Sequence, residues 1–246
     1  MIRIENVYKH FGRVKAVNGI SLDIVKGELF CFLGPNGAGK TTTIKMMTGL
    51  MTPSDGRIRI GDVDVVQEPE AAKQQIGYVP DSAFLYHQLT GVEFLQMVGQ
   101  LYSMADSDLQ YERQALTERL AMGEWLDERI SGYSQGMKQR LAFAAAFIHR
   151  PPVMIIDEPM VGLDPRTART IKDMLKERSR EGVTLFVSTH NLNVAEELAD
   201  RIAIINRGQL IGTGPLSAFR KEGEDGRSLE DLFLEILEIE EGIKPS

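Results

Sequence analysis

The sequence contains a single cysteine, Cys31, and therefore cannot form an internal disulfide. Proteins stabilised by disulfides in oxidising compartments carry several cysteines, so this composition suits a reducing cytosol. Cys31 lies inside the apolar run 29–33, where a free thiol packs as a small hydrophobic side chain. We therefore expect Cys31 to be buried and chemically inert.

Long apolar runs are also absent. The longest run, residues 141–148, is much shorter than the about 18 to 20 residues that cross a bilayer. Residues 1–5 show no charged and then apolar signal pattern. We expect no membrane span here, so a role at a membrane requires a span from another chain.

The sequence has no basic excess. Its 28 Lys and Arg residues are outnumbered by 35 Asp and Glu residues, which gives a net charge of −7. A protein that grips nucleic acid through its phosphates carries an excess of Lys and Arg, so we expect no nucleic-acid partner. With 246 residues, 43% apolar and 26% charged, the chain suits a folded core, alone or with a smaller lobe built into it.

Hydrophobic periodicity predicts an α/β fold. Strand-like runs occupy residues 2–8, 17–25, 28–33, 57–66 and 76–80, and helical spacing occupies residues 40–51, 90–121 and 134–149. From residue 153, strands (153–156, 183–188, 202–205) alternate with helices (167–180, 193–199). This alternation predicts a parallel sheet covered on both faces, with the helical middle third inserted into it. A last helix is expected near residues 229–237.

Residues 34–41 match the phosphate-binding pattern G-x-x-x-x-G-K-[ST] at every fixed position. A strand precedes them and a helix follows, so backbone N–H groups and a helix N-terminus can surround anionic oxygens. Lys40 supplies a charge for the β- and γ-phosphates, and the Thr41 hydroxyl can bind Mg²⁺. A chance glycine-rich turn is the alternative. The predicted nucleotide-binding residues here are Gly34, Pro35, Asn36, Gly37, Ala38, Gly39, Lys40, Thr41 and Thr42.

Two carboxylates, Asp157 and Glu158, follow the apolar strand 153–156. In open α/β sheets, ligands bind at the carboxyl ends of the strands. Asp157 can hold the Mg²⁺ shell, and Glu158, pointing the opposite way along the pleat, can activate a water as general base. The alternative is a solvated strand end without a role.

Residues 131–141 read Ser-Gly-Tyr-Ser-Gln-Gly-Met-Lys-Gln-Arg-Leu. Ser134 is suited to cap the helix that follows, and an exposed capped helix end also attracts anions. The segment resembles the signature of ATP-binding cassette (ABC) ATPases, whose usual core is Leu-Ser-Gly-Gly-Gln. Ser134 and Gly136 match this core, whereas Tyr133, Gln135 and Met137 depart from it.

The resemblance extends over nearly the whole chain. It implies a phosphate-loop NTPase core with a parallel sheet, an N-terminal antiparallel β subdomain and an inserted α-helical subdomain. The implied division is an ATP-binding core at 1–80 and 150–215, a helical signature subdomain at 81–149 and a short tail at 216–246.

Three further residues match family landmarks. Phe11 occupies the place of an aromatic that stacks on adenine, Asp164 lies in a segment similar to the D-loop, and His190 resembles the switch histidine that contacts the γ-phosphate. Each has a simpler alternative: a core aromatic, the start of a helix at Asp164 followed by Pro165, and a packed or capping histidine. Their joint order favours the functional interpretation.

One position departs from the family in a way that affects the metal. The family usually places Gln after the strand at 76–80, and this chain has Asp81. The shorter, charged side chain can still reach Mg²⁺ through water. The alternative is that Asp81 only begins a turn.

The resemblance implies that two ATPase subunits, identical or related, sandwich two ATP molecules, with Mg²⁺ as cofactor. Ser134, Gly136 and Asp164 would contact nucleotide, and Glu158 and His190 would be catalytic. The chain would lie on the cytoplasmic face of the membrane through a separately encoded permease. Short segments around residues 76–80, 89–91 and 133–137 resemble drug and lipid exporters, so we expect export.

Two alternatives remain, namely a soluble ABC ATPase and a nucleotide switch not engaged in transport. Phe84 and Tyr86 are expected either to face the permease or to pack in the core.

Overall fold

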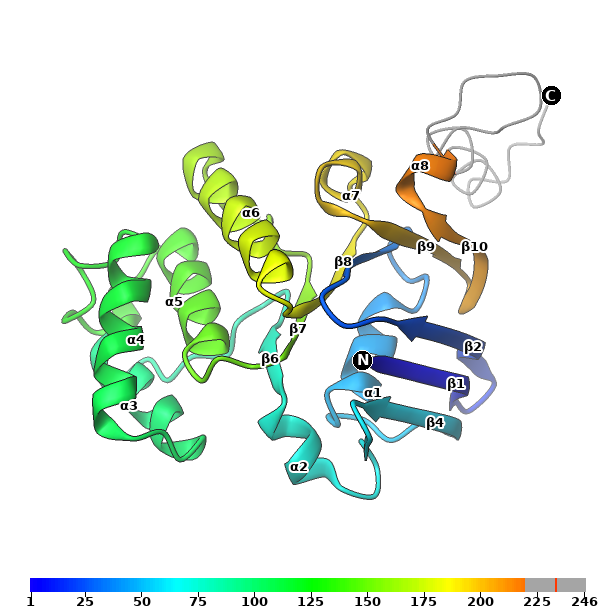
Figure 1. The fold of residues 1–246 in the computed structure, drawn as a ribbon, viewed down its shortest axis with the longest axis horizontal. Helices are drawn as coiled ribbons and strands as arrows, with labels where there is room; N and C mark the ends of the chain where they lie inside the picture. Colours follow the sequence, from blue (N-terminus) through cyan, green and yellow to red (C-terminus); the bar gives the residue numbers. More distant parts are fainter. Residues whose placement is uncertain (220–232, 234–246) are drawn as a thin grey trace.

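The computed structural model describes residues 1–219 and residue 233 of the chain. Their strands form two sheets (Figure 1). The antiparallel sheet has the order β2-β1-β4-β5, made of Val14–Ile24, Ile2–Phe11, Asp55–Ile60 and Val63–Asp64. The second sheet has the order β10-β9-β3-β8-β7-β6, made of Gln209–Pro215, Arg201–Asn206, Leu29–Leu33, Thr184–Thr189, Val153–Asp157 and Ile76–Val79. In it β9, β3, β8, β7 and β6 are parallel, and β10 adds an antiparallel edge.

Three of the helices, α3, α4 and α5, pack together as one group. The elements are α1 (Lys40–Met47), α2 (Pro69–Gln74), α3 (Gly91–Leu101), α4 (Asp106–Arg119), the 3₁₀ turn η1 (Ile130–Gly132), α5 (Gln135–Phe147), α6 (Pro165–Arg180), α7 (Leu192–Leu198) and α8 (Leu216–Phe219). In the chain, α3, α4 and α5 come between β6 and β7. Figure 1 shows these three in green at one end of the molecule, with the antiparallel sheet at the other.

The parallel strands of the second sheet are buried on both faces, as the apolar runs predict, whereas the edge strand β10 is partly exposed. In β3, Leu29, Cys31 and Leu33 belong to one hydrophobic cluster with α5, α6 and α7. Phe30 and Phe32 belong to the other cluster, which joins α1 and the antiparallel sheet. Successive side chains of a strand point to opposite faces, so one short strand contributes to both cores. Cys31 is completely buried, as expected, and burial raises the pKa of its thiol above the ordinary value.

The predicted fold class is confirmed, and several predicted boundaries were wrong. The helix predicted at 40–51 ends at Met47, because Gly49 adopts a left-handed φ of 68°. The helical run at 90–121 is broken into α3 and α4, with Ser103 at φ 55° between them. The short elements α2 and β10 were not predicted, and the helix expected near 229–237 lies outside the described residues.

Membrane spans were not expected in this sequence. Within residues 1–219, each helix is too short or too polar to reach across a bilayer.

Candidate active site

The phosphate loop runs from the end of β3 to Lys40, the first residue of α1. Its glycines are required by close backbone contacts. A Cβ on Gly34 would lie 2.3 Å from the carbonyl oxygen of Ile205, and one on Gly39 would lie 2.5 Å from that of Ala16. Gly39 also has φ 110°, a conformation that other residues rarely adopt. The loop therefore fits between β2 and β9 only with glycine at these positions.

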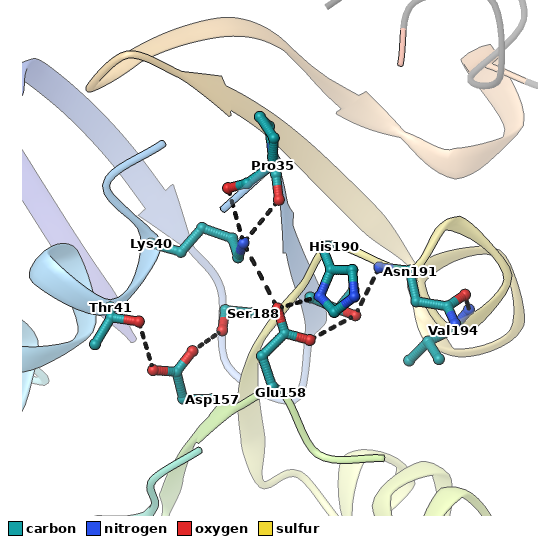
Figure 2. A network of polar contacts seen from close by, with 11 residues as sticks. Pro35, Lys40, Thr41, Asp157, Glu158, Ser188, His190, Asn191 and Val194 are labelled. Atoms are coloured by element: carbon teal, nitrogen blue, oxygen red, sulfur yellow. Dashed lines mark hydrogen bonds and ion pairs between the residues drawn. The ribbon is translucent and has the colours of Figure 1, made fainter. Parts of the chain in front are cut away.

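Lys40 is held inside this loop, with a side chain only 6% exposed. Its ammonium donates to the carbonyl oxygens of Gly34 at 2.7 Å and Pro35 at 3.1 Å (Figure 2). The same nitrogen lies 3.5 Å from Oε1 of Glu158. These contacts fix the ammonium between the phosphate loop and the acidic end of β7.

Asp157 is the last residue of β7, and its carboxylate is almost completely buried. Oδ2 accepts a hydrogen bond from the Thr41 hydroxyl at 2.9 Å, and Oδ1 accepts one from the Ser188 hydroxyl. Burial raises the pKa of the Asp157 carboxyl, the hydrogen bonds from Ser188 and Thr41 oppose this rise, and the nearby charges of Glu158 and Asp81 add to it. A bound cation at Asp157 would offset the cost of this buried charge.

Glu158 points differently from the sequence-based expectation. A continued strand would have aimed its side chain away from the loop, but β7 ends at Asp157 and Glu158 adopts φ 50°. Its carboxylate instead lies beside Lys40, as Figure 2 shows. Oε2 accepts from the Thr189 hydroxyl at 3.3 Å, and Nδ1 of His190 lies 2.8 Å from Oε1. Asp157 and Glu158 thus face the same loop.

The phosphate loop and Glu158 border a cavity of about 190 Å³. The predicted residue Asp81 lies in its wall, close enough for its charge to act on Asp157. Ala38 is buried in the loop behind it. The lining residues are Ala16, Pro35, Asn36, Gly37, Gly39, Lys40, Thr41, Thr42, Asp81 and Glu158.

The predicted residues Ser134, Gly136, Asp164 and Phe11 lie on other elements, outside the lining of this cavity. Ser134 caps α5, accepting from the N–H of Met137 at 3.3 Å, and Gly136 lies in the first turn of that helix. Asp164 caps α6, accepting from two backbone N–H groups at 3.0 Å, so the predicted helix start is present. Phe11 ends β1 with 48% of its surface exposed and the Lys9 ammonium 5.3 Å from its ring centre.

Sequence reasoning missed the hydroxyls of Ser188 and Thr189 and the backbone of Ala16. Ser188 pairs with Asp157 in the parallel register of β7 and β8, and Thr189 follows it. The signal available in the sequence was two hydroxyl residues directly before His190 at the end of a buried strand. They orient the two carboxylates.

Tyr133 stabilises the region before α5. It is 4% exposed, and its hydroxyl lies 2.9 to 3.3 Å from the carbonyl oxygens of Trp125, Leu126 and Glu128. The side chain therefore connects the residue before Ser134 to the segment that follows α4. Buried carbonyl groups that lose their donor destabilise a fold.

We predict that Tyr133→Phe lowers the free energy of unfolding by about 1 kcal/mol, because the three carbonyl groups lose a shared donor. Urea unfolding followed by circular dichroism measures this change. Tyr111→Phe is the matched control, since Tyr111 is 67% exposed, and we expect it to change stability by less than about 0.5 kcal/mol. Equal stability of the two variants would contradict the assignment.

Comparison with known proteins extends these observations. A family model described as ABC transporter matches residues 17–161, which include the phosphate loop, the segment 131–141 and the acidic pair. The linearmycin resistance ATP-binding protein LnrL of Bacillus subtilis (strain 168) is 38% identical over 214 residues, which cover 87% of this chain and 69% of LnrL.

Two solved structures share the fold. The structure of an ATP-binding subunit of an ABC transporter matches with a TM-score of 0.90 at 30% identity, covering 96% of this chain and 99% of that one. The dimeric post-hydrolysis structure of the ATP-binding cassette MJ0796, bound to ADP and Pi, matches with a TM-score of 0.80 at 25% identity, covering 88% and 99%.

Proposed function

This chain belongs to the ABC transporter family as an ATP-binding, ATP-hydrolysing subunit, and from that premise we propose that it drives export through a separately encoded membrane permease. One observation supports this most. The segment 81–86 begins at Asp81 in the wall of the phosphate cavity and continues to Phe84, whose side chain is 85% exposed. A partner that contacts the aromatic end of this segment can therefore move its acidic end.

A relative supports the proposed direction of transport. LnrL is named for resistance to linearmycin. Outward transport of a compound is the most direct way in which a transporter ATPase can give resistance to it, which favours export over import for a similar ATPase. The permease provides the membrane span, and the ATPase lies on the cytoplasmic face through it.

Two copies of the subunit, identical or related, bind two ATP molecules between them in this proposal. A cavity that encloses a small ligand has about 300 to 1,000 Å³, so the 190 Å³ of the phosphate cavity leaves most of a nucleotide uncovered. The remaining surface comes from Ser134, Gly136 and Asp164 of the second copy, with Phe11 stacking on adenine. The dimeric MJ0796 structure with ADP and Pi supports this arrangement.

Mg²⁺ accompanies ATP in the proposed site. It prefers oxygen ligands and usually binds through one or two carboxylates together with water and substrate phosphates. The Thr41 hydroxyl and the Asp157 carboxylate, 2.9 Å apart, provide such donors, and Asp81 lies in the same cavity wall. Within the described part of the chain, no cluster of three or more His, Cys, Asp or Glu could hold a metal. This donor set fits an ion that is held largely by phosphates.

Catalysis then depends on positioning and charge. Loop N–H groups and Lys40 stabilise the phosphates, and Mg²⁺ would add positive charge at their oxygens. Glu158 accepts a proton from the attacking water, and its contacts with Thr189 and His190 hold the carboxylate in place. His190 lies at the end of β8, where it can also contact the γ-phosphate.

In this proposal, each part of the chain has its own role in ATP binding and hydrolysis. The core at 1–80 and 150–215 holds ATP, and the helical part at 81–149 carries both the signature and the segment 81–86, which is the proposed permease surface. Most of the tail expected at 216–246 lies outside the described residues. Movement of the helical part during nucleotide binding would carry the permease surface with it.

A paired experiment tests the permease surface. We predict that Phe84→Ser lowers recovery of the multi-span protein encoded by the neighbouring reading frame at least about tenfold in co-purification, because a large anchor side chain is lost. The ATPase rate of the isolated subunit should stay within about twofold. Val25→Ser, a variant of another exposed apolar residue (61% exposed), is the control. Undiminished recovery with Phe84→Ser would contradict the proposed surface.

Transport is tested separately. In inverted membrane vesicles containing both proteins, ATP should drive uptake of a fluorescent amphiphilic drug. A complex that binds ATP and the permease without moving such compounds would indicate a nucleotide switch. Absence of any membrane partner would indicate a soluble ATPase.

A further inference from the structure

Gln135 occupies a position where the family signature usually has glycine, and its side chain contacts another functional segment. It is the first residue of α5, directly after the cap Ser134. A Cβ added to Gly162 would lie 3.0 Å from Cγ of Gln135, so the Gln135 methylenes pack directly against the Gly162 backbone. A Cβ added to Gly136 would lie 3.8 Å from the Gly162 carbonyl oxygen. The start of α5 therefore lies against residue 162.

Gly162 belongs to the short segment that leads from the acidic pair to α6. The segment starts at Glu158, whose N–H donates to the Ser188 carbonyl at 3.1 Å, and a turn follows in which Val161 N–H donates to the Glu158 carbonyl at 3.3 Å. It ends at Asp164, which caps α6. Gly162 has φ 75° at the bend. Gly162 directly follows this turn, so a displacement at residue 162 acts on the turn that begins at Glu158.

We propose that Gln135 is a positioning residue that, by packing against Gly162, sets the turn leading out of Glu158 and so aligns the Glu158 carboxylate with Lys40 and His190. Two contacts restrict the position of the Glu158 carboxylate, since Oε1 is 3.5 Å from Nζ of Lys40 and 2.8 Å from Nδ1 of His190. A displacement of about 1 Å in a catalytic group can cost about 100-fold in rate. A smaller shift of the turn costs less but remains measurable.

The contact has a consequence that rests on the proposed function. Ser134 faces the nucleotide of the second copy, and Gln135 is its neighbour in the chain. When α5 of one copy closes on the ATP bound by the second copy, its Gln135 moves against Gly162 of the same chain. Gly162 in turn positions Glu158 of that chain, which acts on the other ATP. A side chain at position 135 makes this link, whereas a glycine there has no methylenes to press on residue 162.

The test compares side chains of different length at position 135. Gln135→Ala removes the atoms that touch Gly162, and Gln135→Met keeps a chain of similar length without the amide. We expect Gln135→Ala to lower kcat about fivefold with KM for ATP within twofold, and Gln135→Met to restore at least half of the wild-type kcat. Gln114→Ala, an exposed glutamine on α4, is the matched control and should leave kcat unchanged. Unchanged kcat in Gln135→Ala, or equal losses in the Ala and Met variants, overturns the proposal.

A second measurement separates positioning from contact between copies. In a Glu158→Gln background, ATP-dependent dimer formation is followed by size-exclusion chromatography with and without Gln135→Ala. Equal dimer formation supports positioning of Glu158. Loss of the dimer only with Gln135→Ala overturns it, because Gln135 would then act at the interface. If Glu158→Gln alone forms no dimer, the two-copy part of the proposed function fails, and the kcat comparison still decides the role of Gln135.

Discussion

Glu158→Gln is expected to lower the ATP hydrolysis rate at least about 100-fold while leaving ATP affinity close to that of the native chain. A general base contributes about 10²- to 10⁴-fold to a rate, and a neutral amide cannot accept the proton of the attacking water. The glutamine has nearly the same shape, so its oxygen can still accept from the Thr189 hydroxyl that now lies 3.3 Å from Oε2.

The expected retention of binding also has an electrostatic reason. The Glu158 carboxylate lies 3.5 Å from the Lys40 ammonium, which also binds the phosphates in the proposed site. Without the negative charge of Glu158, the positive charge of Lys40 attracts an anionic ligand more strongly. The affinity for ATP should therefore be equal to that of the native chain or higher. Phosphate release measures the rate, and equilibrium binding of a fluorescent ATP analogue measures the affinity.

Glu181→Gln is the matched control for Glu158→Gln. Glu181 is an exposed residue at the end of α6, paired with Arg178 at 2.9 Å and far along the chain from the acidic pair. Its variant should hydrolyse ATP at the native rate. Hydrolysis by Glu158→Gln within a few-fold of the native rate would rule out Glu158 as the base and require another acceptor for the proton.

Lys40→Ala is expected to weaken ATP binding about 100-fold or more. Hydrogen bonds to charged groups contribute about 1.5 to 3 kcal/mol each, and 1.4 kcal/mol corresponds to a factor of ten. The ammonium is nearly buried, so water cannot easily take its place. Its loss also leaves the Glu158 carboxylate beside the cavity with one positive neighbour fewer, which repels phosphate further.

A double variant tests that second contribution. Lys40→Ala combined with Glu158→Gln should bind ATP more tightly than Lys40→Ala alone, because the repelling charge is gone. Calorimetric titration with Mg-ATP measures all three variants, and Lys26→Ala, a variant of an exposed lysine in the turn before β3, is the control. Native affinity in Lys40→Ala would remove Lys40 from the nucleotide site.

The sequence-based interpretation succeeded where local rules apply. A strand, a glycine-rich loop and a helix predicted the path of residues 29–47, since these conformations depend on neighbouring residues. Ser134 and Asp164 were recognised as possible helix caps for the same reason, and both cap helices. It failed at Glu158, where a pleat was assumed to continue. At Phe84 it left two alternatives open, and the exposed side chain excludes core packing.

By itself the sequence determined the order of the longer α and β elements, the phosphate loop and the place of the two carboxylates at the end of a strand, because periodicity, glycine and the length of a buried strand act over a few residues. Only the tertiary structure decided that Ser188 and Thr189 hold those carboxylates, that Asp81 reaches the cavity, and that Gln135 rests on Gly162. These contacts join residues that are 27 or more positions apart, or depend on which face a turn presents. Strand register and helix packing determine such proximity, and no short-range pattern encodes it.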